Sequence, residues 1–307
     1  MGSDRKTATE RVWAELPVDA RRALEVELPP SDLRSLQLDL ARTRAAEVTP
    51  ADVMRQWDHD RFVRPSTADP RELQRVEARL WDLLPDRFRG VELSPVVPLG
   101  TCSAVSPVDQ NQVVSTVRGT EVLSDPTNAL AVEAAHRRRR EPGDRVDLAA
   151  CHRVLRAQLF SGSAQFAHFR LFALVSSARD RGSGRTEADL LIEHLRYWQS
   201  VLADLVGHGR PALTYTNFAD GVVAERIADT VLPALDDGPV PVRPDPTRTQ
   251  GRGYYTGAAL RLVLEDGDSY RDFGDGGFTD WVATLTGNAK ERSLTSCVSV
   301  ERLAELG

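Results

Sequence analysis

Residues 250–257 read Gln-Gly-Arg-Gly-Tyr-Tyr-Thr-Gly and are the most informative stretch of this sequence, because they combine side chains that could take part in chemistry. Arg252 offers a positive charge for an anion, and Tyr254 and Tyr255 offer aromatic rings with polar ends. Such a group suits a pocket for a small polar ligand. A tyrosine pair on a strand is also common in a hydrophobic core, so this segment alone does not define a site.

Further segments with reactive or charged side chains follow one another along the chain. Arg156 and Gln158 lie in residues 152–158, and Phe169 lies in residues 166–172. Residues 276–280 read Gly-Gly-Phe-Thr-Asp, and Arg302 lies close to the end of the sequence. Guanidinium groups bind phosphates, and an aromatic ring can stack on a nucleotide base. These side chains are therefore of the types that an ATP-binding site needs.

In this order and spacing, the segments resemble the catalytic domain of histidyl-tRNA synthetase, a class II aminoacyl-tRNA synthetase. The resemblance covers roughly residues 70–307. It implies that Arg156 contacts the α-phosphate of ATP and Arg302 the γ-phosphate, and that Phe169 stacks on adenine. Gln158 stands where the family has a glutamate beside the adenine amino group. Mg²⁺ is inferred from the use of ATP alone.

The resemblance also implies a substrate pocket. Tyr254 and Tyr255 match the tyrosines that line it, and Gln250 stands where the family has an arginine for the substrate carboxylate. Arg252 or Arg248 could supply the missing charge. Asp125, followed by Thr127, is the match for an acidic substrate ligand, although the same Asp-Pro-Thr segment is also a common helix start.

Two departures separate this sequence from the family. Leu171 and Val175 stand at the positions of two polar residues that hold the α-amino group of the amino acid, and apolar side chains cannot hold an ammonium group. Residues 295–299 read Thr-Ser-Cys-Val-Ser, whereas the family has a glycine-rich segment that passes close to the nucleotide. We therefore expect a substrate other than ordinary histidine.

Composition narrows the class of protein. With 39 Lys and Arg against 45 Asp and Glu, the net charge of −6 does not suggest a nucleic-acid binder. The three cysteines form no Cys-x-x-Cys pair, which argues against a zinc site and fits a reducing cytoplasm. The polar start and the lack of a long apolar run indicate neither a signal peptide nor a membrane span. We expect a soluble, cytoplasmic protein with no metal site of its own side chains.

Hydrophobic periodicity predicts an N-terminal helical extension over residues 1–69, either as a layer on the main domain or as a partner surface or lid. For residues 70–307 it predicts an α+β domain with an antiparallel sheet flanked by helices. Long helices are expected from Asp125, over 185–205 and over 220–235. Strands are expected over 90–97, 113–123, 151–158, 166–175 and 260–264. The helix and strand over 70–97 resemble the family's dimer interface, which implies a homodimer.

Two functions remain open from the sequence. The first is a stand-alone ligase that activates a small carboxylic or amino acid as an acyl-adenylate and passes it to a small acceptor. The second is a regulatory or ligand-sensing protein that resembles the regulatory subunit of ATP phosphoribosyltransferase. The sequence stops five residues after Arg302, where the synthetases continue into an anticodon-binding domain, so ordinary tRNA charging is not expected. A dimeric scaffold is a third possibility.

Overall fold

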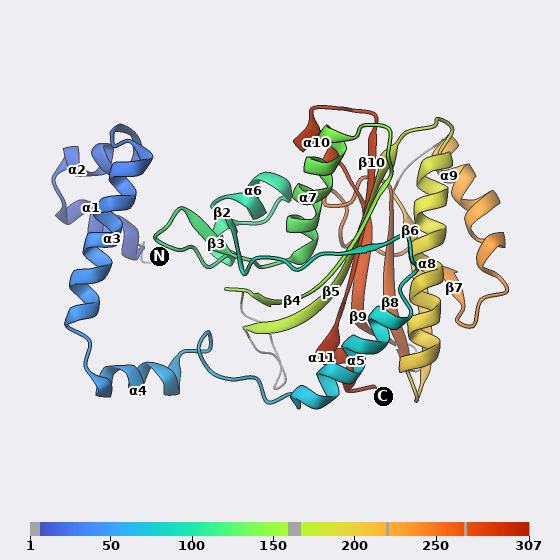
Figure 1. Cartoon of the computed structure of the whole chain (residues 1–307), viewed down its shortest axis with the longest axis horizontal. Coiled ribbons are helices and arrows are strands. Elements are labelled where there is room, and N and C mark those ends of the chain that lie inside the picture. The colour runs from blue at the N-terminus through green and yellow to red at the C-terminus, as the bar shows by residue number, and fades with distance from the viewer. Residues whose placement is uncertain (1–6, 159–166, 219–220, 267–268, 307) are drawn as a thin grey trace, which may run out of the picture. The chain divides into compact units, whose positions relative to one another are not determined.

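The computed structural model describes residues 7–158, 167–218, 221–266 and 269–306 (Figure 1). The chain divides into two units, one made of residues 1–59 with 115–120 and the other of residues 60–114 with 121–307. No helix within the described ranges is both long enough and apolar enough to cross a membrane.

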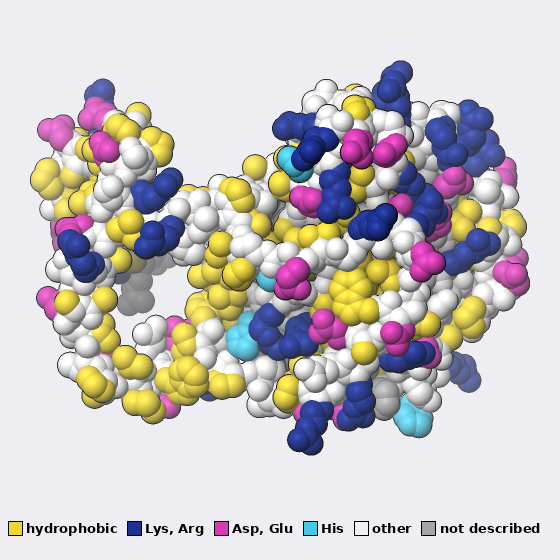
Figure 2. Space-filling view, in the orientation of Figure 1, with side chains coloured by type: hydrophobic (Ala, Val, Ile, Leu, Met, Phe, Trp, Pro, Cys, Tyr) yellow, Lys and Arg dark blue, Asp and Glu magenta, His cyan; other side chains and the backbone are white. Residues whose placement is uncertain are grey.

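The N-terminal unit is helical. Thr7 and Glu10 form a capping box at its first helix, and Thr49 and Asp52 bond each other in the same way before its last. None of the described residues in these helices is buried, and apolar side chains are spread over their surface in Figure 2. The helical segments are α1 (Ala8–Glu15), α2 (Val18–Arg22), a π-helical segment (Ala23–Glu27), α3 (Pro30–Ala46) and α4 (Pro50–His59).

A mixed eight-stranded sheet forms the centre of the second unit. Its inner strands are antiparallel, whereas β1 pairs with β4, and β7 with β6, in parallel. In spatial order the strands are β1 (Arg89–Gly90), β4 (Val146–Leu155), β5 (His168–Arg179), β10 (Glu291–Ser299), β9 (Ser269–Thr279), β8 (Ala258–Asp266), β6 (Arg210–Asn217) and β7 (Val242–Pro244). A separate two-stranded sheet joins β2 (Val96–Pro98) and β3 (Thr120–Val122).

Helices cover both faces of the sheet (Figure 1). One core holds α5 (Pro70–Asp82), α8 (Arg185–Leu205) and α11 (Val300–Ala304) against the sheet, with Trp198 fully buried. The other packs α7 (Pro126–Arg140) on β4 and β5, and α10 (Trp281–Thr286) on α7 and β10. Alternation along each strand divides its side chains between these cores. The remaining helical segments are α6 (Thr101–Val105), α9 (Val222–Arg226), a π-helical segment (Ile227–Val231) and two 3-10 turns (Gln110–Gln112 and Pro233–Leu235).

A buried chain of polar side chains ties α8 to the sheet. Ser176 Oγ donates to Asp147 Oδ1 over 2.5 Å and lies 2.9 Å from His194 Nε2. His194 Nδ1 lies 2.8 Å from Ser296 Oγ, which also accepts from Trp198 Nε1. Burial lowers the pKa of His194 to about 3, and the nearby Arg145 adds to this effect. His194 is therefore neutral at physiological pH.

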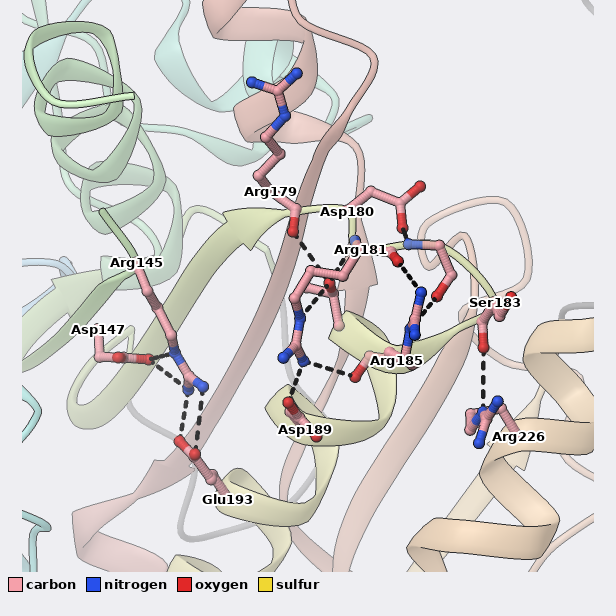
Figure 3. Close-up of polar contacts among 12 residues, drawn as sticks. Arg145, Asp147, Arg179, Asp180, Arg181, Ser183, Arg185, Asp189, Glu193 and Arg226 are labelled. Carbon is pink, nitrogen blue, oxygen red and sulfur yellow. Dashed lines mark hydrogen bonds and ion pairs between the residues drawn. The ribbon is translucent and has the colours of Figure 1, made fainter. Parts of the chain in front are cut away.

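Arginines hold the connection between β5 and α8 (Figure 3). Arg181 contacts the carbonyl of Arg185 and the carboxylate of Asp189, and Arg226 Nε donates to the carbonyl of Ser183 over 3.1 Å. Ser183 has φ 54°, which is the left-handed region that non-glycine residues rarely adopt. These contacts fix the point at which α8 begins.

The structure confirms the α+β fold and the expected flanking helices. The helix from Asp125 and the helix over 185–205 form as expected, with Asp125 as the N-cap of α7. The sheet is mixed at its edges rather than purely antiparallel. Residues 222–235 are helical, as expected, but they are divided among an α-helical, a π-helical and a 3-10 segment and do not form one regular α-helix.

Strand predictions were less accurate than helix predictions. The expected strand over 90–97 is interrupted, since only its two ends pair as β1 and β2. β4 and β5 begin and end a few residues from the predicted limits, and residues 159–166, where we expected the loop between them, lie outside the described residues. The short strand β7 was not predicted.

Candidate functional site

A cavity of about 860 Å³ opens on the second unit. Its lining comes from β5, β8, β9, β10 and α11, from the loop over 248–255 and from the segment that leads into α5. Seven carboxylates and four arginines line it, so the described lining has an excess of negative charge. The charged residues are Asp69, Glu72, Asp125, Asp272, Asp275, Glu301 and Glu305, with Arg156, Arg248, Arg261 and Arg302.

Arg156 lies just after β4 and projects into this cavity. Its Nε donates to the carbonyl of Ser124 over 2.9 Å, and its Nη2 donates to Asp125 Oδ2 over 3.1 Å. The guanidinium carbon lies 5.2 Å from the centre of the Phe169 ring, which is a cation–π contact. Two of the residues expected at the nucleotide are therefore in contact, and both are held by neighbouring elements.

Asp125 has two roles at once. Its Oδ1 accepts from the backbone N–H and the hydroxyl of Thr127, which caps α7, while its Oδ2 binds Arg156. Both Asp125 and Thr127 line the cavity, and their predicted contact with a substrate stays a prediction. Asp125 can therefore cap a helix and also belong to a site, because one carboxylate oxygen caps α7 and the other binds Arg156.

Arg302 reaches the same cavity from α11. Ser299 caps this helix through Arg302 N, and Arg302 Nη1 donates to the carbonyl of Asp272 over 2.7 Å. The side chain is exposed, so its free donors face solvent at the rim. A guanidinium in this position can contact the outer end of a bound polyphosphate.

The loop over 248–255 places Arg248, and not Arg252, in the cavity. The Arg248 side chain is only 3% exposed, and it donates to the carbonyls of Gln250 (2.9 Å) and Leu260 (3.0 Å). Burial lowers the pKa of Arg248, and the facing carboxylate of Asp275 opposes this shift. Arg252 is exposed and packs over the Phe218 ring at 5.2 Å, outside the described cavity lining.

Gln250 and Gln158 differ in where they lie. Gln250 lines the cavity, and its Oε1 accepts from Arg261 Nη2 over 3.4 Å, so a second arginine stands beside the position where the family has one. Gln158 is exposed and does not belong to the described lining. Its predicted contact with adenine stays a prediction.

The two tyrosines form one wall. Their rings make an edge-to-face contact with centroids 4.9 Å apart, and Tyr254 makes a similar contact with Trp281 at 5.4 Å. Burial raises the pKa of both phenols, with Asp125 and Asp275 adding to the shift, so both hydroxyls stay protonated and can donate. A Cβ on Gly277 would lie 2.5 Å from the Tyr255 ring, so glycine is required for this packing.

Glycines of β9 bring its backbone close to that of β10. The family-like segment on β10 has none, but Gly274 and Gly276 on β9 lie directly against it. A Cβ at Gly274 would come within 2.5 Å of the carbonyl oxygen of Cys297, and one at Gly276 within 2.3 Å of that of Thr295. Close backbone packing at the floor of the cavity therefore persists through β9.

Leu171 and Val175 lie on the same face of β5 but differ in surroundings. Leu171 lines the cavity, whereas Val175 is buried in the core beneath α7 and α10. Neither side chain offers a polar group to a ligand.

Sequence reasoning missed the segment that leads into α5. Arg61 donates to the carbonyls of Arg156 and Ala157, and His168 Nε2 lies 2.7 Å from the carbonyl of Arg64. A carbonyl only accepts, so Nε2 carries the proton and Nδ1 accepts from Arg153, 2.9 Å away. Thr67, Ala68 and Asp69 then line the cavity. No local motif in this segment predicts these long-range contacts.

No group of three or more potential ligands among His, Cys, Asp and Glu is placed to hold a metal ion within the described ranges. Mg²⁺ commonly binds through one or two carboxylates together with substrate phosphates, and does not need a protein cage. The cavity carboxylates near Arg302, such as Asp272, are of the type required.

Comparison with known proteins shows the fold of this chain. No protein-family model and no curated protein matches it. Among solved structures, apo histidyl-tRNA synthetase from S. aureus is similar with a TM-score of 0.56 and 15% identity, over 85% of this chain and 67% of that one. The histidyl-tRNA synthetase of Nostoc sp. PCC 7120 has a TM-score of 0.56 and 16% identity, over 80% and 74%.

A third similar structure is of a protein that is named for two functions. It is an ATP phosphoribosyltransferase regulatory subunit/histidyl-tRNA synthetase from Bacillus halodurans, with a TM-score of 0.60 and 11% identity, over 77% of this chain and 79% of that one. The resemblance seen in the sequence is thus confirmed as a shared fold, that of the class II aminoacyl-tRNA synthetase catalytic domain. At these identities the likeness carries the fold alone.

Proposed function

We propose that this protein is an ATP-dependent ligase that activates a small carboxylic or amino acid as an acyl-adenylate and transfers it to an acceptor other than tRNA. The observation that carries the proposal is the meeting of Arg156, Phe169 and Arg302 in one cavity with a polar substrate wall. These three side chains come from separate segments of the sequence. The two arginines can bind phosphate groups, and the phenylalanine ring can stack on a base.

In the proposed first step, a carboxylate oxygen of the acid attacks the α-phosphorus of ATP, and the bond to pyrophosphate breaks. Arg156 is held by Ser124 and Asp125 and stabilises the charge that develops on the α-phosphoryl oxygens. Arg302 binds the terminal phosphate, and Phe169 stacks on the base. Mg²⁺ would neutralise phosphate charge when it is bound with ATP.

In the proposed second step, the acceptor attacks the acyl carbon and AMP leaves with the electrons of the broken C–O bond. Arg248 is the residue that we assign to the substrate carboxylate, because it is the buried cation beside Gln250. Its two carbonyl contacts fix the guanidinium before the substrate binds, which reduces the cost of ordering it. We assign Asp125, Thr127, Tyr254 and Tyr255 to the remainder of the substrate pocket.

We further propose that residues 70–307 form the catalytic domain of a cytoplasmic homodimer, with residues 1–69 as an extension. At the end of that extension Thr67, Ala68 and Asp69 line the cavity, and Arg61 contacts the backbone at Arg156. Three free cysteines are compatible with a reducing compartment.

A second candidate function is a regulatory or ligand-sensing protein that does not catalyse acylation. Its support is the similarity to the Bacillus halodurans protein and the presence of the neutral Gln158 and Gln250 where the resemblance implies a glutamate and an arginine. Such a protein would bind ATP or a small acid in the same cavity without turnover.

ATP–pyrophosphate exchange with Mg²⁺ and a panel of amino and other carboxylic acids tests the ligase. Acid-dependent exchange is expected in the wild type, and Arg156→Ala should lower it by at least 100-fold, because a preorganised donor to the transition state is lost. Arg179→Ala is the matched control, since its exposed side chain lies outside the described cavity lining. Tight binding of ATP or histidine with no exchange for any acid would favour the sensor instead.

A further inference from the structure

The described lining of the cavity has more carboxylates than arginines. Bound ATP would add further negative charge to this excess. Part of that excess sits on Asp275, whose side chain is 50% exposed although it belongs to a central strand. In register, Asp275 lies opposite Cys297 of β10, and both residues line the cavity. Its carboxylate therefore faces the ligand space.

The cation nearest to Asp275 does not satisfy it. Arg248 Nη2 lies 3.6 Å from Asp275 Oδ2, beyond direct hydrogen-bond range, and Arg248 Nε and Nη1 donate to backbone carbonyls. Burial raises the pKa of Asp275, the charge of Asp125 adds to this, and Arg248 opposes it. Asp125 itself is engaged by Arg156. A carboxylate oxygen of Asp275 can therefore accept a hydrogen bond from a positively charged group of a ligand.

The position of Asp275 indicates which end of a ligand it would contact. Arg302 is bound to the carbonyl of Asp272, and Asp275 follows three residues later, about 10 Å further along an extended strand. There it interacts with Tyr255, in the wall that Tyr255 forms with Tyr254. Aromatic faces beside a carboxylate are a favourable environment for an organic cation. Asp275 thus lies toward the tyrosine wall and away from the phosphate-binding rim.

We propose that Asp275 determines specificity for a substrate acid that carries a second, positively charged group, an amine or a guanidine, on the part of the molecule that meets the tyrosine wall. The identity of the reacting end rests on the ligase function proposed above, but the cation contact does not. Tyr254 and Tyr255 would pack against the alkyl and cationic part of this substrate.

Matched pairs of acids test the proposal without any variant. Lysine and norleucine share an α-amine and differ in the terminal charge, whereas 5-aminopentanoate and pentanoate have no α-amine. In ATP–pyrophosphate exchange we expect the charged member of each pair to be preferred by about 10- to 100-fold in KM, the effect of one hydrogen bond to a charged group. Equal use of both members by the wild type would overturn the proposal and leave the ligase intact.

Asp275→Asn should remove the preference and leave KM for norleucine and pentanoate unchanged. Asp280→Asn, one residue beyond the same strand, is the control and should keep the preference, because Asp280 is exposed and lies outside the described cavity lining. Urea unfolding of each variant checks that the fold persists. If no acid supports exchange, calorimetric titration of lysine and norleucine without ATP separates the two ideas. Lysine binding that Asp275→Asn removes would retain the Asp275 assignment and reject the ligase, and binding insensitive to Asp275→Asn, or none, would overturn the assignment.

Discussion

Arg156 Nη2 lies 3.1 Å from Asp125 Oδ2, and this ion pair joins the end of β4 to the first turn of α7. The same carboxylate caps α7 through its other oxygen. One residue therefore holds the arginine that we assign to the α-phosphate and also fixes the helix beside the substrate pocket. The relationship makes binding geometry and helix stability depend on a single side chain.

Replacement of Asp125 separates these two effects. Asp125→Ala removes both the cap and the ion pair and should lower the free energy of unfolding by about 1–2 kcal/mol. Asp125→Asn keeps an oxygen for the Thr127 N–H and should lose less than about 1 kcal/mol. Urea unfolding measures both. Equal losses for the two variants would show that the cap contributes nothing.

Helix positions were the part of this fold that the sequence predicted well. α8 forms over the expected residues because its apolar side chains recur along one side for 21 residues, and α7 begins at a recognisable Asp-Pro-Thr cap. The region around 220–235 was harder, because a π-helical segment and Pro233 interrupt a pattern that would suit one helix.

Part of the lining of the candidate site was predicted from the sequence. Arg156, Phe169 and Arg302 meet in one cavity, as do Asp125 and the tyrosine pair. Local pattern could not choose between Arg248 and Arg252, because the choice depends on which way a loop with two left-handed glycines, Gly251 and Gly253, directs each side chain. The contact of Arg61 with the backbone at Arg156 joins residues 95 positions apart and has no local signal.

His194 makes stability depend on pH. Its folded-state pKa of about 3 lies below its ordinary value of 6.5, so between these values the unfolded chain binds one more proton than the folded chain. Stability from neutral His194 is full above pH 6.5 and falls by about 1.4 kcal/mol per pH unit below it.

Urea unfolding between pH 4 and 7 checks this dependence. His194→Gln should remove most of that slope, at a constant cost for the altered contacts with Ser176 and Ser296. His208→Gln is the control, because His208 is exposed and its loss should leave the slope unchanged. An unchanged slope in His194→Gln would contradict the assignment.

A buried ion pair joins α7 to β10. Arg138 donates through Nε and Nη2 to the two carboxylate oxygens of Glu291, over 2.8 and 2.9 Å, and the side chains are 1% and 3% exposed. Arg138→Leu should lower the free energy of unfolding by about 3–5 kcal/mol, because it leaves a buried carboxylate without its partner. The double variant Arg138→Leu, Glu291→Leu should recover part of this loss. Urea unfolding of the single and double variants would detect it, and additive losses would show that the two groups are not coupled.

The two arginines that flank Gln250 test which residue binds the substrate carboxylate. Arg248 is buried in the cavity wall, and Arg252 lies over Phe218 outside it. If Arg248 binds the substrate carboxylate, Arg248→Gln should reduce ATP–pyrophosphate exchange by at least about 100-fold, the cost of removing one preorganised donor. Arg252→Gln should change it by less than about twofold, because surface substitutions away from a site have small effects. The reverse order would place Arg252 at the substrate. A loss in Arg248→Gln counts only if urea unfolding shows that the variant is folded, since the same guanidinium also donates to the carbonyls of Gln250 and Leu260.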